Sequence, residues 1–121
     1  MSNISDKIVR EIVYNKYGGR CAYCGCRLNN TSFVIDHIKA LRRGERDKNK
    51  KGSNAIENFN PSCFSCNSSK GVFTIEQWRS ELAQKKKRLN RDSSSYRIIL
   101  RFKLIQENDV PIKFYFESYG I

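Results

Sequence analysis

The chain has 121 residues, enough for one domain with a modest core that a metal or disulfides would reinforce. Its 23 Lys and Arg residues outnumber 12 Asp and Glu residues, and the net charge of +11 favours a polyanionic partner over a membrane surface. Without an opening apolar run like a signal peptide, or roughly 18 consecutive apolar residues, we expect a soluble cytoplasmic protein.

The N-terminal segment, residues 1–19, is predicted to form an amphipathic helix. Its apolar residues recur at the spacing of one helix face: Ile8, Val9, Ile12, Val13 and Tyr17. Gly18-Gly19 follows and can adopt the left-handed conformation that ends a helix. We expect this helix to pack over the core.

Two CxxC pairs, Cys21/Cys24 and Cys63/Cys66, frame the centre of the chain. Four such thiols predict a structural zinc, which would have no open position for catalysis. A redox protein that uses CxxC is the weaker alternative, because two pairs and strong basicity suit zinc and nucleic acid better. Cys26 lies too close to Cys24 in sequence to be expected as a ligand, so it is interpreted as a spare, oxidisable thiol.

Between the two pairs, Phe33-Val-Ile35 is predicted to be a short strand that leads into Asp36-His37, and His37 is the single histidine of the chain. The oxygens of Asp36 and of Asn67, beside the second pair, suit a hard cation such as Mg²⁺, and a neighbouring neutral imidazole suits phosphodiester hydrolysis. A structural role for His37 stays open. Adjacent residues of a strand point to opposite faces of the sheet. Asp36 and His37 can therefore serve the same site only if the strand bends or ends here.

Residues 39–54 are predicted to form a basic surface loop. Seven basic residues fall within its first part: Lys39, Arg42, Arg43, Arg46, Lys48, Lys50 and Lys51. Such a composition cannot form a core, so we expect the loop to lie at the surface and to contact phosphates.

The C-terminal part, residues 74–121, is predicted to begin with a helix that Thr74 opens. Residues 96–104 fit both the alternation of a strand and the spacing of a helix, and periodicity alone does not decide between them. Residues 112–116 alternate as a final strand.

Three segments together resemble the HNH endonuclease family with its ββα-metal site. They are Cys21-Ala-Tyr-Cys24-Gly, Asp36-His37-Ile-Lys-Ala-Leu-Arg-Arg-Gly44, and Asn58-Phe-Asn-Pro-Ser-Cys63-Phe-Ser-Cys66-Asn67-Ser-Ser-Lys70-Gly. The resemblance implies an α+β fold with a small ββα-metal core at residues 20–73, held by a four-cysteine zinc site. An N-terminal helix and a C-terminal helix/strand extension would flank this core within one domain, residues 1–121. It also favours a helix for residues 94–102.

The resemblance further implies a role for each matching residue. His37 matches the general base, and Asp36 matches a ligand of the catalytic metal. Asn58 matches the central asparagine that orients the loop and the histidine. Asn67 stands where some members have a second histidine, which favours Mg²⁺ or Mn²⁺ over a transition metal. The expected DNA contacts are Lys39, Arg42, Arg43, Arg46, Lys70, Arg79 and Lys86.

The sequence therefore predicts a DNA endonuclease with a structural Zn²⁺ and one catalytic Mg²⁺ or Mn²⁺. The resemblance implies the cytoplasm of a prokaryotic cell or of a phage-infected host. The alternative is a catalytically idle, zinc-stapled DNA-binding module. Whether the protein forms a homodimer, and hence nicks DNA or cuts both strands, stays open.

Overall fold

A computed structural model describes residues 3–120, with side chains from residue 6 onward. Contacts divide the chain into two compact units. Unit 1 contains the chain up to Ile75 and again from Lys113, and unit 2 is Glu76–Ile112. No helix of the described residues is both long enough and apolar enough to cross a membrane.

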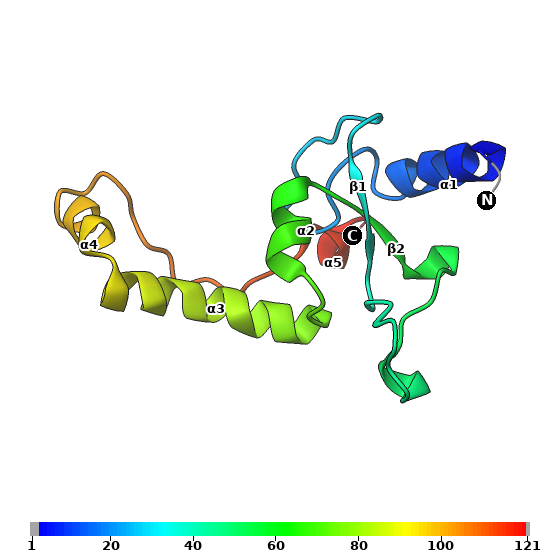
Figure 1. Ribbon diagram of the computed structural model, residues 1–121. Helices are drawn as coiled ribbons and strands as arrows, with labels where there is room; N and C mark the ends of the chain where they lie inside the picture. Colours follow the sequence, from blue (N-terminus) through cyan, green and yellow to red (C-terminus); the bar gives the residue numbers. More distant parts are fainter. Residues whose placement is uncertain (1–2, 121) are drawn as a thin grey trace. The chain divides into compact units, whose positions relative to one another are not determined.

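Unit 1 is built on a two-stranded antiparallel sheet followed by a helix. Strand β1 (Val34–His37) pairs with β2 (Phe59–Ser62), and Asp36 lies opposite Asn60 in the register. Helix α2 (Phe64–Lys70) follows β2 and contacts β1 (Figure 1). Cys63 caps α2, since its sulfur accepts a hydrogen bond from the Cys66 amide at 3.4 Å. This arrangement confirms the predicted small α+β fold.

Helix α1 (Asn3–Asn15) packs near β2 and confirms the predicted N-terminal helix. Val13 on α1 is buried, and the Lys16 ammonium just after the helix donates hydrogen bonds to the Phe59 carbonyl and to Asn60 Oδ1. Burial lowers the pKa of Lys16. The chain then turns at Gly19, where φ is +82° and a Cβ would lie 2.8 Å from the Tyr14 hydroxyl.

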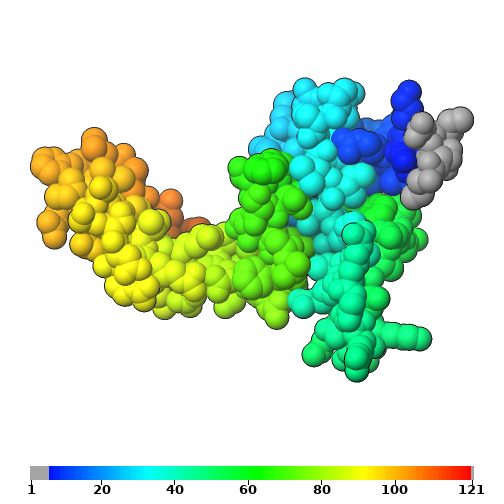
Figure 2. All heavy atoms as spheres, in the orientation of Figure 1, coloured from blue at the N-terminus to red at the C-terminus, as the bar shows by residue number. Residues whose placement is uncertain are grey.

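The basic loop between the strands is closed at its base by backbone contacts. The Gly52 amide donates to the Ala40 carbonyl at 2.7 Å, and a Cβ on Gly52 would lie only 1.7 Å from the Lys39 carbonyl oxygen. Glycine is therefore required by this close approach. The loop includes the 3₁₀ turn η1 (Lys48–Lys50), and a second turn, η2 (Ile56–Asn58), precedes β2. In Figure 2 the teal segment that contains the loop projects from the rest of unit 1.

The C-terminal segment of unit 1 forms a short helix, α5 (Tyr115–Ser118), and the strand predicted over residues 112–116 is therefore wrong. The amides of Tyr115 and Phe116 donate to the carbonyls of Tyr23 and Ala22, at 3.0 and 2.8 Å. Phe114 is buried and stacks on Phe116 with ring centroids 5.9 Å apart. The alternating apolar residues thus fill the core beside the first cysteine pair instead of extending a sheet.

Unit 2 consists of α3 (Ile75–Asp92), α4 (Ser94–Arg101) and the segment that returns to unit 1. Helix α4 settles the ambiguity of residues 96–104 in favour of a helix. Ser93 caps it, because the Ser93 hydroxyl accepts a hydrogen bond from the Tyr96 amide at 3.1 Å. The Glu107 carboxylate accepts a hydrogen bond from the Tyr96 hydroxyl at 2.7 Å, which fixes the returning segment.

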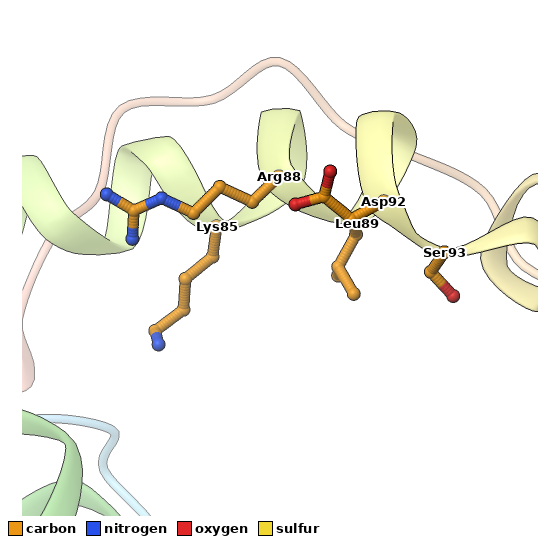
Figure 3. Close-up of a pocket in the computed structure, with 5 residues that line it drawn as sticks. All are labelled: Lys85, Arg88, Leu89, Asp92 and Ser93. Carbon is orange, nitrogen blue, oxygen red and sulfur yellow. The ribbon is translucent and has the colours of Figure 1, made fainter.

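The basic C-terminal half of α3 carries a shallow surface pocket of about 380 Å³. Figure 3 shows the side chains that line it: Lys85, Arg88, Leu89, Asp92 and Ser93. The Arg88 guanidinium is already paired with Glu81 at 2.8 Å, and none of the predicted catalytic residues lines the pocket. This pocket is therefore separate from the candidate site described below.

Candidate functional site

The predicted zinc residues lie together in unit 1. The Sγ atoms of Cys24 and Cys63 are 3.9 Å apart, and the Cys66 thiol hydrogen-bonds with the Cys21 thiol. A tetrahedral zinc with Zn–S bonds of about 2.3 Å has S···S edges of about 3.8 Å. The spacing of Cys24 and Cys63 therefore fits two ligands of one zinc ion, and the four thiols that lie within 4.8 Å of one another include Cys26 where the sequence predicted Cys66.

The thiols differ in how their environment affects their protonation. The hydrogen bond from the Cys66 thiol is the main cause that lowers the pKa of Cys21 to about 4, and the same contact raises the pKa of Cys66. Cys21 is buried and also lies near backbone donors of the first cysteine loop. The surroundings of Cys21 thus favour its thiolate form, and thiolates are the form that binds zinc.

Cys26, which the sequence led us to expect as a spare thiol, also lies in this cluster. Among the described residues, the Sγ atoms of Cys21, Cys24, Cys26 and Cys63 all lie within 4.8 Å of one another. The Cys21 amide donates to the Cys26 carbonyl at 2.8 Å, which folds the loop back on itself. Five thiols therefore face a site that needs four.

Asp36 is buried near the end of β1, where a tyrosine and a lysine hold its carboxylate. Its Oδ2 atom accepts a hydrogen bond of 2.5 Å from the Tyr23 hydroxyl and lies 3.1 Å from the Lys70 ammonium. Burial, and then the Asp36 charge, raise the pKa of Tyr23, so that hydroxyl stays a proton donor. Asn60 donates to the Tyr23 hydroxyl at 3.3 Å and extends the network across the sheet.

Lys70 is fully buried, and its predicted contact with DNA is therefore wrong. Its ammonium pairs with Asp36 and also donates a 2.9 Å hydrogen bond to the carbonyl of His37. Lys70 thus attaches the end of α2 to the last two residues of β1. Asn67 lies three residues earlier on α2 and therefore on the same side of the helix, which faces β1.

His37 ends β1, which satisfies the condition that the strand stop at the candidate site. Its half-exposed ring lies edge-on to Phe59, with centroids 5.1 Å apart, and its Nε2 atom lies 2.9 Å from Asn54 Oδ1. Because a carboxamide oxygen can only accept, this contact is a hydrogen bond when Nε2 carries the proton. The side chains of Asp36 and His37 have separate partners, as expected for neighbours on a strand.

Asn58 closes the basic loop where it meets β2. Its Oδ1 atom accepts a hydrogen bond from the Lys39 amide, and its Nδ2 atom donates to the carbonyls of Lys39 and Ser53, all at 2.8–2.9 Å. The Asn58 carbonyl also accepts from the amide of Ile38, the residue after His37. The Asn58 side chain thus ties the two ends of the loop together, and its backbone carbonyl holds them beside the end of β1.

The remaining candidate DNA contacts differ in their surroundings. Lys39, Arg42, Arg43 and Arg46 are exposed on the basic loop. In unit 2, the Arg79 guanidinium pairs with Glu76 at 3.0 Å, and the Lys86 ammonium donates to the Asn108 carbonyl at 2.9 Å. Because Arg79 and Lys86 are half-buried, the exposed loop cations are the more accessible set.

The sequence did not indicate Tyr23 or Asn54. Tyr23 stands between the two cysteines of the first pair, where only its aromatic character favours burial. Asn54 stood in a polar loop, and only the closed base of the loop brings it to His37. Neither partner could be found from spacing along the chain.

Comparisons with known proteins agree with this geometry. The family model described as HNH endonuclease matches residues 21–73, which contain the cysteine cluster, β1, the basic loop, β2 and α2. A candidate HNH endonuclease derived from the SPbeta prophage, YoqL of Bacillus subtilis (strain 168), is 34% identical over 64 residues. That match covers 51% of this chain and 27% of the relative, so the chain spans only part of its length.

A similar fold occurs in a solved structure, the Type II-C Cas9 enzyme from Actinomyces naeslundii. The alignment covers 83% of this chain and 10% of that enzyme, with a TM-score of 0.54 and 22% sequence identity. At this level of identity the likeness concerns the fold alone. The part of this chain that matches the HNH endonuclease family is therefore residues 21–73, which contain the ββα arrangement and the clustered thiols.

Proposed function

We propose that this protein is a metal-dependent endonuclease that hydrolyses phosphodiester bonds in DNA, with His37 as the general base. The observation that carries the proposal is the position of His37 at the end of β1, half-exposed and held by Asn54 beside a buried carboxylate. The family match and the net charge of +11 support DNA as the substrate. The exposed cations of the basic loop would bind the phosphates of the DNA backbone.

In the proposed mechanism, His37 takes a proton from the attacking water at Nδ1. Its Nε2–H is donated to Asn54, so the lone pair of the neutral ring lies on Nδ1. Phe59 supports one side of the ring. Asn58 keeps the loop closed beside this residue and thereby limits where the phosphate backbone can lie.

Asp36 and Asn67 would hold the catalytic cation. Their carboxylate and carboxamide oxygens suit Mg²⁺ or Mn²⁺, and the contacts of Tyr23 and Lys70 both go to Oδ2 of Asp36. When bound, the cation would offset the charge that develops on the leaving oxygen. The buried ammonium of Lys70 keeps the carboxylate in position but opposes a second positive charge nearby.

Incubation of the purified protein with supercoiled plasmid tests the proposal. We expect nicked or linear DNA to appear with Mg²⁺ or Mn²⁺ and not with a chelator of these ions, while zinc stays bound. A linear product that increases faster than the nicked product as protein concentration rises would point to paired subunits. Absence of cleavage with every divalent metal, together with salt-sensitive DNA binding, would instead favour an idle DNA-binding module.

A substitution at Asn54 tests how the base is held. In Asn54→Ala, we expect both neutral tautomers of His37 to be populated, because the Nε2–H loses its acceptor. The cleavage rate at saturating DNA should fall roughly 2- to 10-fold, the value of one hydrogen bond of about 0.5–1.5 kcal/mol. The tautomer is measured by two-bond ¹H–¹⁵N correlation of the imidazole, which is unambiguous because the chain has one histidine.

Asn49→Ala provides the matched control, since Asn49 is an exposed asparagine of the same loop. This variant should keep the parent's single tautomer and rate. Asn54→Asp retains an acceptor oxygen and should restore the Nε2-protonated ring at a pH where the imidazole is neutral. An unchanged tautomer in Asn54→Ala would show that Asn54 does not orient the ring.

A further inference from the structure

The cysteine cluster has more thiols than one zinc ion can bind. The sulfurs of Cys21, Cys24 and Cys63 lie within 4.8 Å of one another and of the Cys26 sulfur. Cys66 shares thiol hydrogen bonds with Cys21 and Cys63. A tetrahedral zinc accepts four thiolates, so one of the five is left out at any time.

We propose that Cys26 and Cys66 are alternative fourth ligands of the same zinc ion, while Cys21, Cys24 and Cys63 are common to both arrangements. Exchange breaks one Zn–S bond and forms another, with no change of oxidation state. The arriving thiol gives up its proton as it binds, and the departing thiolate takes one up. The ion therefore stays four-coordinate in either state.

The two competing thiols belong to different elements, which gives the exchange a structural consequence. Cys26 lies in the first cysteine loop, where Gly25 has a φ of +79° and allows the chain to turn Cys26 back beside Cys21. Cys66 lies in the first turn of α2. When Cys26 binds, α2 remains attached to zinc only through its cap, Cys63. When Cys66 binds, the first turn of α2 is attached as well.

The position of Cys66 next to Asn67 connects this exchange with the proposed nuclease site. Release of Cys66 removes a restraint on the neighbouring residue of α2, whereas Lys70 at the other end of the helix remains held by Asp36. This consequence rests on the proposed function, but the exchange itself does not. Its test therefore uses metal binding and thiol reactivity rather than cleavage.

Cobalt substitution of single and double variants tests the exchange. Cys66→Ser should still bind one metal ion, with the absorption spectrum of Co²⁺ bound by four thiolates, because Cys26 completes the set. Cys26→Ser should behave alike, and each single variant should bind zinc within about tenfold of the parent, or 1.4 kcal/mol. The Cys26→Ser/Cys66→Ser double variant should lose the four-thiolate spectrum. Its loss of zinc-binding free energy should be much larger than the sum of the losses in the two single variants.

Cys21→Ser is the matched control, because a shared ligand has no substitute and its loss should reduce the thiolate count by one. A three-thiolate spectrum in Cys66→Ser would overturn the proposal. If that variant does not fold, alkylation of the zinc-loaded parent decides: we expect about one thiol per chain to react, divided between Cys26 and Cys66. Modification confined to Cys26 would show that Cys66 is the sole fourth ligand and would also overturn it.

Discussion

Asp36→Ala is expected to lower the free energy of unfolding by about 3–5 kcal/mol, with zinc present. The substitution leaves the Lys70 ammonium, whose side chain is fully buried, without its carboxylate partner, and the Tyr23 hydroxyl also loses its acceptor. Urea denaturation followed by tryptophan fluorescence measures the change. Stability equal to that of the parent would contradict a buried ion pair between Lys70 and Asp36.

This instability would obscure the catalytic role of Asp36, because an unfolded variant is inactive for any reason. The double variant Asp36→Ala/Lys70→Met removes both charges and keeps most of the buried volume of lysine, so it should recover most of the lost stability. We expect this folded variant to remain unable to cleave DNA, since a proposed ligand of the catalytic metal is missing. Lys70→Met alone serves as the control, and cleavage by the double variant would exclude Asp36 as a ligand.

His37→Ala is expected to reduce the rate of DNA cleavage by about 10²- to 10⁴-fold, the usual contribution of a general base. The fold should persist, because the ring is half-exposed and its contacts with Phe59 and Asn54 lie at the end of β1, outside the core. Single-turnover cleavage at saturating protein measures the rate of the chemical step. Added imidazole should restore part of the activity, if it enters the space that the ring leaves.

Phe59→Leu is the control for the loss of the ring contact. It removes the edge-on contact with His37 but retains both the imidazole and the Asn54 hydrogen bond, so its cleavage rate should stay within about tenfold of the parent. Parent-like cleavage by His37→Ala would remove His37 from the mechanism. Equal losses in His37→Ala and Phe59→Leu would point to a structural role for the ring.

Local patterns along the chain were sufficient to predict several elements. The apolar spacing before Gly18-Gly19 predicted α1, and the short apolar run before Asp36 predicted β1. The paired cysteines predicted a metal cluster because CxxC loops bring thiols together whatever surrounds them. These features depend on residues that are close in sequence, which is why they could be recognised.

The erroneous predictions concern residues whose partners are distant in sequence. Residues 112–116 alternate like a strand, but the amides of Tyr115 and Phe116 bond to the first cysteine loop, so the chain bends into α5. A lysine such as Lys70 is usually found at the surface. Here it is buried, because its ammonium pairs with the carboxylate of Asp36, a residue far away in the sequence. Periodicity and charge contain no information about such partners.

Spacing and residue chemistry by themselves predicted a cluster of thiols and one histidine beside an acid, and the resemblance to the HNH endonuclease family implied the ββα core. Only the tertiary structure decided that Lys70 pairs with the acid, that Asn54 lies beside Nε2 of His37 and that Cys26 joins the thiol cluster. Hydrogen bonds and ion pairs act over about 3 Å, and residues far apart in the chain reach that distance only after folding.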